Sequence, residues 1–403
     1  MHSVTDTATP LSILSADHAA FDFQPRTRVI FGAGTFSRLG TVARETGQER
    51  VLLVTDPGLR QAGHCDTAVD CLKAAGLSVA VFDDVAQNPT TDDVDRCVAC
   101  ARHHQIQLIV GLGGGSSMDC AKGTNFLLTN GGRMQDFRGV GKATKPMLPM
   151  IAVPTTSGTG SEAQSFAVIA DAETHMKMAC GDHKAACRVA ILDPLLTITM
   201  PSSVAAVTGI DAITHAIESY VTTRRNPISQ MFSRQAWQLL SAAFPVVMNQ
   251  PENVEARGQM LLGAHLAGAA IENSMLGATH AAANPLSAHF DIVHGSAVGM
   301  LLPHVIRWNA TEVGSLYRDL ALAAGWAERH DSVEEATEAL VTGFTELLTM
   351  AQIPRSLTEV LAAEPDEATV AMLATEASQQ WTATFNPRHM DADSFQRVYR
   401  NAM

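Results

Sequence analysis

Short apolar runs recur through the first half of the chain, and each ends in turn residues such as Gly or Asp. The runs are RVIFGAG (28–34), VLLVTDPG (51–58), SVAVFDDV (78–85), LIVGLGGGSS (108–117) and PMIAVPTTSG (149–158). Segments with helical spacing separate several of them, and buried runs that lead into helices are typical of βαβ units. The pattern predicts an α/β domain with a parallel sheet.

The pattern changes near Pro201. Strand-like runs give way to long segments with helical spacing, which begin with SSVAAVTGIDAITHAIESYVTT and continue to the C-terminus. We therefore predict an α/β dinucleotide-binding domain over residues 1–200 and an all-helical domain over 201–403. The active site is expected in a cleft between the two domains.

Composition excludes some classes of partner. Hydrophobic residues make up 46 % of the 403 residues, which is enough for a large core, and 28 basic against 41 acidic residues give a net charge of −13. Nucleic acids and anionic membranes require clustered cations, so neither is an expected partner. The first 25 residues lack the pattern of a secretory signal, and no apolar stretch approaches the ~18 residues that span a bilayer.

The seven cysteines are an odd number for a disulfide framework and favour a reducing, cytoplasmic location. Cys97 and Cys100 form a CxxC, but their segment has helical spacing and no second CxxC completes a zinc site. We interpret them as helix cysteines that pack in the core rather than as a redox or metal pair.

A glycine-rich loop follows the strand-like run that begins at residue 105. Gly111, Gly113, Gly114 and Gly115 precede Ser116, which opens a helix. Such a loop lets backbone N–H groups approach a pyrophosphate, although the spacing is not GxGxxG and an ordinary strand-to-helix turn would look similar. An acid that could accept hydrogen bonds from a ribose 2′-hydroxyl ends an earlier strand, at Asp56.

A second polar loop, PTTSGTGSEA at 154–163, follows the next strand. It contains five hydroxyl side chains and two glycines within ten residues. Taken alone, it could be a merely solvated loop. Two such loops in consecutive strand–loop units together favour a phosphate-binding surface.

Four residues in the second half form a candidate metal site. Asp211 and His215 are four residues apart and share a helix face, while His280 and His294 follow later. A carboxylate with three imidazoles suits Fe²⁺ or Zn²⁺ and can leave a coordination position for substrate. Spacing alone does not exclude three rival histidines, which are His265, His289 and His304.

The motifs together, in this order, resemble the iron-containing (group III) alcohol dehydrogenase family. They are RVIFGAG, VTD, QNPT, GGGSSMDCAK, PTTSGTGSE, ILDPLLTITMP, GIDAITHAIESY, THAAANPL, VHG, LLPHVIRWN and FNPRHM. The similarity covers nearly the whole chain. It implies a dinucleotide-binding α/β domain followed by a helical metal-binding domain, which agrees with the split read from the pattern.

The resemblance also implies roles for individual residues. It places the metal ligands at Asp211, His215, His280 and His294. The implied contacts with the nucleotide cofactor are Asp56, Asn88, Gly114, Gly115, Ser116, Asp119, Thr155, Thr156, Thr159, Phe166, Lys177, Leu196 and Met200. An Asp at position 56 is the family's usual mark of preference for NAD over NADP.

The chain departs from the family pattern at Asn284. Many members carry a His there, near the nicotinamide, and asparagine cannot titrate. The catalytic proton carrier is therefore unknown: we favour water and ribose hydroxyls, with His289 as the alternative. Gln164 and Thr199 are smaller departures, where relatives often carry Thr and Gly.

The resemblance implies an NAD-dependent, iron-containing alcohol dehydrogenase that interconverts a small primary alcohol and its aldehyde, with Fe²⁺ or Zn²⁺ polarising the substrate oxygen. It also implies a homo-oligomer. The alternatives are a glycerol-dehydrogenase-like or dehydroquinate-synthase-like member of the same superfamily, or a non-catalytic NAD- or metal-binding protein. Sequence does not identify the alcohol.

Overall fold

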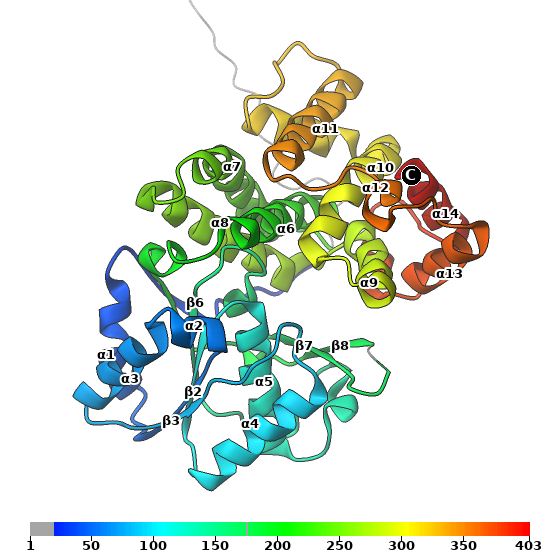
Figure 1. Cartoon of the computed structure of the whole chain (residues 1–403). Coiled ribbons are helices and arrows are strands. Elements are labelled where there is room, and N and C mark those ends of the chain that lie inside the picture. The colour runs from blue at the N-terminus through cyan, green and yellow to red at the C-terminus, as the bar shows by residue number, and fades with distance from the viewer. Residues whose placement is uncertain (1–19, 175) are drawn as a thin grey trace, which may run out of the picture.

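The computed structural model describes residues 20–174 and 176–403, so the prediction about a signal segment falls largely outside it. Figure 1 shows an α/β region in the first half of the chain, below a helical region formed by the second half. The last strand ends at Leu192 and the first long helix begins at Ser202. The predicted domain boundary lies in this connection.

A six-stranded parallel sheet forms the centre of the first region, in the order β1-β9-β6-β4-β2-β3. Its strands are β1 (Arg28–Phe31), β2 (Arg50–Val54), β3 (Ser78–Phe82), β4 (Leu108–Gly113), β6 (Met150–Pro154) and β9 (Val189–Leu192). The predicted parallel α/β sheet is therefore confirmed. Its five predicted strands are all present, but β9 was missed.

Alternating side chains of the strands pack on both faces of the sheet. In β2, Val51 and Leu53 pack against one pair of helices, while Leu52 and Val54 pack against another. The first pair is α1 (Leu39–Glu45) with α3 (His64–Ala74), and the second is α4 (Thr91–His103) with α5 (Gly115–Asn130). Because both faces are covered, the strands read as continuous apolar runs.

A smaller sheet in the order β5-β8-β7 was not predicted. Its strands are β5 (Gly139–Val140), β7 (Phe166–Ala170) and β8 (Lys177–Gly181). One strand has two residues, and exposed or half-buried side chains alternate with buried ones in the other two. The two-residue strand is too short to show a period, whereas the two longer strands were overlooked. The sheet matters because Phe166 and Lys177 begin its two longer strands.

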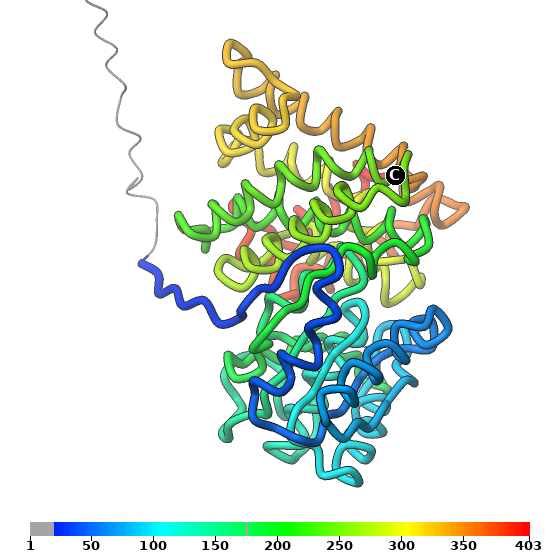
Figure 2. Tube along the Cα trace, turned by 90° about the vertical axis from the view of Figure 1, so that its left-hand side faces the viewer, coloured from blue at the N-terminus to red at the C-terminus, as the bar shows by residue number. Residues whose placement is uncertain are grey.

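The second half is helical, as predicted, and Figure 2 shows its long helices stacked over the α/β region. The helices are α6 (Ser202–Val221), α7 (Pro227–Asn249), α8 (Val254–Ser274), α9 (Ala278–Phe290), α10 (His294–Ala323), α11 (Val333–Met350), α12 (Leu357–Leu361), α13 (Glu367–Ser378) and α14 (Ala392–Asn401). None of the described helices is long and apolar enough to cross a membrane.

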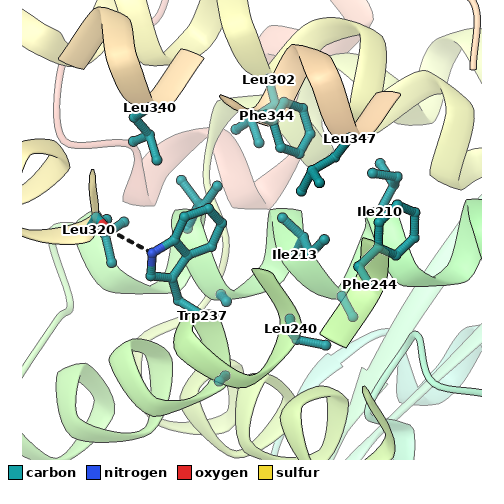
Figure 3. Packing of buried hydrophobic residues seen from close by; sticks show 14 of the residues in the cluster. Ile210, Ile213, Trp237, Leu240, Phe244, Leu302, Leu320, Leu340, Phe344 and Leu347 are labelled. Atoms are coloured by element: carbon teal, nitrogen blue, oxygen red, sulfur yellow. Dashed lines mark hydrogen bonds between the residues drawn. The ribbon is translucent and has the colours of Figure 1, made fainter. Parts of the chain in front are cut away.

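A large apolar core holds α6 in place. Ile210 and Ile213 of α6 pack with Phe244 and with Trp237, whose indole N–H donates to the Leu320 carbonyl at 2.7 Å (Figure 3). At 100° per residue, these isoleucines lie on the side of α6 away from Asp211 and His215. One face of α6 is thus fixed by packing, while the other presents polar groups.

The two regions touch where backbones meet without intervening side chains. Gly160, in the loop after β6, has φ +60°, and a Cβ there would lie 2.6 Å from the Ala264 carbonyl of α8. A Cβ on Gly268 of α8 would lie 2.4 Å from the Gly160 carbonyl. A Cβ on Gly158 would lie 2.7 Å from the side-chain Cβ of Thr208 of α6. The second polar loop is therefore clamped against the helical region.

Candidate active site

The loops that follow β2 and β4 lie at the point where the strand order of the large sheet reverses. Strands β2 and β4 are neighbours, yet β3 lies between them in sequence and pairs on the far side of β2. Ligands of open α/β sheets bind at such a reversal, beyond the carboxyl ends of the strands. Both the Asp56 loop and the glycine loop leave the sheet there.

Asp56 bridges these two loops. It caps the short helix α2 (Pro57–Gln61) by accepting the Leu59 N–H at 3.1 Å, and its other oxygen accepts the Ser117 hydroxyl at 3.3 Å. Since Ser117 belongs to α5, the carboxylate is held beside the start of that helix. Asp56 thus lies next to the glycine loop in space, although the two are far apart in the sequence.

The glycine loop contacts the second polar loop directly. A Cβ on Gly115 would lie 2.7 Å from Cγ2 of Thr159, and one on Gly114 would lie 3.2 Å from the Thr156 side chain. The Thr155 N–H donates to the Gly113 carbonyl at 3.1 Å. The two loops therefore form one surface, and side chains on these glycines would push them apart.

Buried polar contacts beneath this surface fix the second loop. The ammonium of Lys122 is fully buried and donates to the Ser161 carbonyl at 2.6 Å, the Ser161 hydroxyl at 2.8 Å and the Phe166 carbonyl at 2.9 Å. Asp119 accepts the same hydroxyl at 2.8 Å, and burial raises its pKa. Lys122 was not predicted, although it follows Asp119 by three residues on one helix face.

The remaining residues predicted to contact the nucleotide lie in two separate places. Asn88, with φ +54°, has its N–H 3.2 Å from the Ser116 hydroxyl and accepts from the Lys177 ammonium at 3.2 Å, so these three residues lie together. Burial lowers the pKa of Lys177. Leu196, by contrast, is buried in the sheet core, and Met200 is half-buried beyond it.

Phe166 contacts the helical region rather than only its own sheet. Its ring lies 5.5 Å from that of Trp381, at an interplanar angle of 31°. Trp381 opens the 3-10 helix η6 (Trp381–Phe385), close to the C-terminus. A residue predicted beside the cofactor therefore touches a segment from the opposite end of the chain.

The four predicted metal ligands converge from three helices. Oδ1 of Asp211 lies 3.4 Å from Nε2 of His215, 3.5 Å from Nε2 of His280 and 3.8 Å from Nε2 of His294. Asp211, His215 and His280 are buried, and 29 % of the His294 side chain is exposed. Among the described residues, Asp211 Oδ1 and His280 Nε2 have no hydrogen-bond partner.

These groups perturb one another strongly. Burial opposes ionisation of Asp211, but the surrounding imidazoles outweigh it and hold its pKa well below the usual range. Burial lowers the pKa of His215 to about 4 and that of His294 to about 3. Burial also opposes protonation of His280, yet the nearby carboxylates of Asp211 and Glu218 raise its pKa to about 9.

Glu218 was missed by the sequence prediction. Its carboxylate lies 2.6 Å from Nδ1 of His280 and accepts the Thr279 N–H at 2.6 Å. Asp211, His215 and Glu218 are spaced by four and then three residues, so all three share one face of α6. That spacing is visible in the sequence and would have included the acid.

The rival histidines lie elsewhere. His265 is buried against Glu162, with its Nδ1 3.1 Å from that carboxylate. His289 is exposed and pairs with Glu376 at 2.9 Å, while burial lowers the pKa of His304 to about 4. Asn284 donates to the Gln380 side chain at 3.2 Å.

The predicted CxxC lies on α4. Cys97 is buried in the core, Cys100 is half-buried, and both are free thiols. The structure therefore agrees with packing cysteines on a helix.

Comparison with known families covers both regions. The family described as iron-containing alcohol dehydrogenase matches residues 25–194, and its C-terminal counterpart, Fe-containing alcohol dehydrogenase family, C-terminal, matches residues 205–403. The chain belongs to the iron-containing alcohol dehydrogenase family. The family resemblance, the fold class and the alcohol–aldehyde oxidoreductase activity inferred from the sequence are thereby confirmed.

Individual relatives extend over nearly the whole chain. 1,3-Propanediol dehydrogenase of Klebsiella pneumoniae is 34 % identical over 384 residues, covering 95 % of this chain and 98 % of the relative. Lactaldehyde reductase of Escherichia coli K12 is 32 % identical, covering 92 % and 97 %. A crystal structure of 1,3-propanediol oxidoreductase superposes with a TM-score of 0.92 at 33 % identity, covering 96 % and 100 %.

Proposed function

We propose that this iron-containing alcohol dehydrogenase transfers hydride reversibly between NAD(H) and a small primary alcohol/aldehyde pair. The convergence of Asp211 with imidazoles carries the proposal. Ligand atoms of Asp211, His215 and His280 lie within 4.8 Å of one another, and Nε2 of His294 lies 3.8 Å from Asp211 Oδ1. The matching family models and the relatives named as alcohol dehydrogenases favour this reaction over the glycerol-dehydrogenase-like and dehydroquinate-synthase-like alternatives.

The ligand set fits a divalent metal ion. Asp211, His215, His280 and His294 would hold Fe²⁺, and imidazole with carboxylate also accepts Zn²⁺. The unpartnered Asp211 Oδ1 and His280 Nε2 are buried polar atoms that a cation would satisfy. When bound, such an ion supplies Lewis acidity toward the substrate oxygen.

The two polar loops would hold NAD. Backbone N–H groups at the start of α5 favour a pyrophosphate, and Gly114 and Gly115 keep the approach open. Asp56 would accept the ribose 2′-hydroxyl and repel a 2′-phosphate, which supports NAD over NADP. Asn88, Ser116 and Lys177, which are linked to one another, would contact the cofactor on its other side.

Proton movement must avoid position 284. Asn284 can orient a hydrogen-bonded partner but cannot carry a proton, and His289 is held at the surface by Glu376. We therefore propose that water and the ribose hydroxyls relay the proton. Glu218 would hold the Nδ1 side of His280, which leaves Nε2 directed at Asp211.

Relatives guide the proposal for the substrate. They are named as dehydrogenases of 1,3-propanediol and methanol and as a reductase of lactaldehyde, all of which are small molecules. We propose a small alcohol or aldehyde here, in a homo-oligomeric and cytoplasmic enzyme. Seven free cysteines in the described part of the chain support a reducing compartment.

The test is NADH oxidation by the purified protein against a panel of small aldehydes. Each assay follows chelation, and then anaerobic addition of Fe²⁺ or Zn²⁺. Turnover restored by metal is the expected result, and the best aldehyde identifies the substrate type. Stoichiometric NADH binding without turnover under any metal would instead support the non-catalytic alternative.

A further inference from the structure

The start of α9 is capped by residues from distant parts of the chain. Gly277, at the N-cap position, offers no side chain, so the first N–H groups of the helix need outside acceptors. Glu218 of α6 accepts the N–H groups of Gly277 at 3.2 Å and Thr279 at 2.6 Å. The N–H between them, that of Ala278, donates to Oδ1 of Asn386 at 3.2 Å.

Asn386 is itself held in one orientation. Its Nδ2 donates to Oδ1 of Asn309 at 2.7 Å and to the Arg388 carbonyl at 2.7 Å, while Nδ2 of Asn309 donates back to its Oδ1 at 3.0 Å. Asn386 is 4 % exposed and Asn309 is 1 % exposed. A flipped amide would set donor against donor, so the carbonyl oxygen is fixed toward Ala278.

The turn fits closely against both acceptors. A Cβ on Gly277 would lie 3.1 Å from Asn386 Oδ1 and 3.1 Å from Glu218 Oε1. The glycine therefore lets the backbone reach the two remote caps. His280 is the third residue of the helix that begins at this turn, so its place depends on where the turn is held.

We infer that Asn386, held by Asn309, is a positioning residue for the metal site. It acts by fixing the first turn of α9, and hence His280. Asn386 belongs to FNPRHM and Asn309 to LLPHVIRWN, two motifs that meet in the fold and have no assigned role. The inference rests on the proposed metal site. Groups that orient a metal ligand typically change metal affinity by about 10–100-fold, and Asn386 acts through the backbone rather than on the imidazole itself.

The test is titration of the metal-free full-length protein with Co²⁺, followed by its visible absorption band. For Asn386→Ala we expect the Co²⁺ dissociation constant to rise roughly tenfold, the lower end of that range, with a changed band shape. Binding of NADH should stay within about twofold of wild type, because the nucleotide loops lie on the other domain.

Asn226→Ala is the matched control. Asn226 is also 4 % exposed and caps a helix of the same domain, α7, by accepting the N–H groups of Ile228 and Ser229. It should lower the melting temperature to a similar extent while leaving Co²⁺ affinity and the band unchanged. Equal losses of affinity in both variants would overturn the inference, because they would indicate general softening of the domain.

A second variant covers the case in which Asn386→Ala does not fold. Gly277→Ala keeps both amides but pushes the turn away from its two caps, so weaker Co²⁺ binding is again expected. Wild-type affinity in the variants that fold overturns the positioning role. His280→Ala separates the two levels: a wild-type protein that binds Co²⁺ no better than His280→Ala overturns the metal site itself.

Discussion

The two halves of the proposed active site differ in what forms them: one relies on backbone contacts at glycines, the other on ionisable side chains. The nucleotide half consists of two loops whose glycines remove side chains so that backbones can meet each other and a ligand. The metal half consists of ionisable side chains from three helices, which are buried except for the partly exposed His294, and Glu218 holds the Nδ1 side of His280. The nucleotide half depends on the absence of side chains at its glycines, whereas the metal half depends on the presence of particular side chains and their partners.

This contrast determines how each half should fail. A small added group should damage the nucleotide half, and a small removed group should damage the metal half. Each variant should also leave the other half intact, because the nucleotide loops leave the large sheet while the metal ligands lie on helices of the second half of the chain. The following changes test that separation.

His280→Ala is expected to have the largest effect. It removes a ligand from the buried cluster, so kcat/KM should fall by about a thousandfold or more and retained metal should be lost. NADH affinity should hardly change. The measurement combines steady-state kinetics, metal analysis and NADH fluorescence titration, with His330→Ala, an exposed histidine, as control. A kcat/KM close to wild type would remove the metal from the mechanism.

Gly115→Ala should damage the opposite half. The new Cβ would lie 2.7 Å from Cγ2 of Thr159, so NADH affinity should fall by roughly 10–100-fold, or about 1.4–2.8 kcal/mol. Metal content should stay at the wild-type level. Combining it with Thr159→Ser removes the clashing methyl group and should restore part of the NADH affinity. Additive losses in the double variant would show that the clash is not the cause.

Glu218→Gln tests the paired character of the metal half. The amide removes the charge that faces His280, and the metal dissociation constant should rise by roughly tenfold or more. Equilibrium dialysis against a competing chelator measures this constant. Glu376→Gln, at an exposed pair with His289, is the matched control and should leave it unchanged.

Asp56→Ser should change cofactor preference. Serine can still cap α2, so the loop is retained while the charge that opposes a 2′-phosphate is lost. The ratio of kcat/KM for NADPH to that for NADH should rise roughly tenfold, or about 1.4 kcal/mol. An unchanged ratio would mean that discrimination lies elsewhere in the site.

His289→Ala should have the smallest effect. Because His289 is exposed and paired with Glu376, kcat and its pH profile should stay within about twofold of wild type, as for most surface substitutions. A lost ionisation in the pH profile would instead assign the proton relay to this residue.

Sequence predicted the two halves unequally. The nucleotide loops are contiguous motifs, so their residues can be recognised from the order of amino acids alone, and their partner Asp56 followed from the position of one strand. Lys122 was missed because a single lysine in a helix reads as a surface residue, while here its ammonium is fully buried. Its role depends on a loop about 40 residues further along the chain.

The metal half required contacts that spacing does not reveal. Asp211 and His215 share one helix, but His280 and His294 could be selected over His265 and His304 only through the family resemblance. Glu218 followed from helical periodicity and was overlooked, whereas Asn386 is more than 100 residues from Ala278. Strand β9 is as long as β1, and β7 and β8 are as long as β2, so these three strands were overlooked rather than hidden. Only β5, with two residues, is too short to show a period.

The contact between Gly160 and Gly268 limits how this enzyme can be recombined with its relatives. A hybrid that exchanges the helical half must keep glycine at position 160 and supply glycine at position 268, because either Cβ would lie within 2.6 Å of a facing carbonyl oxygen. Joining sequences near residue 200 is therefore not a modular operation. A hybrid should therefore keep Gly160 and Gly268 together, because they form the contact between the two regions.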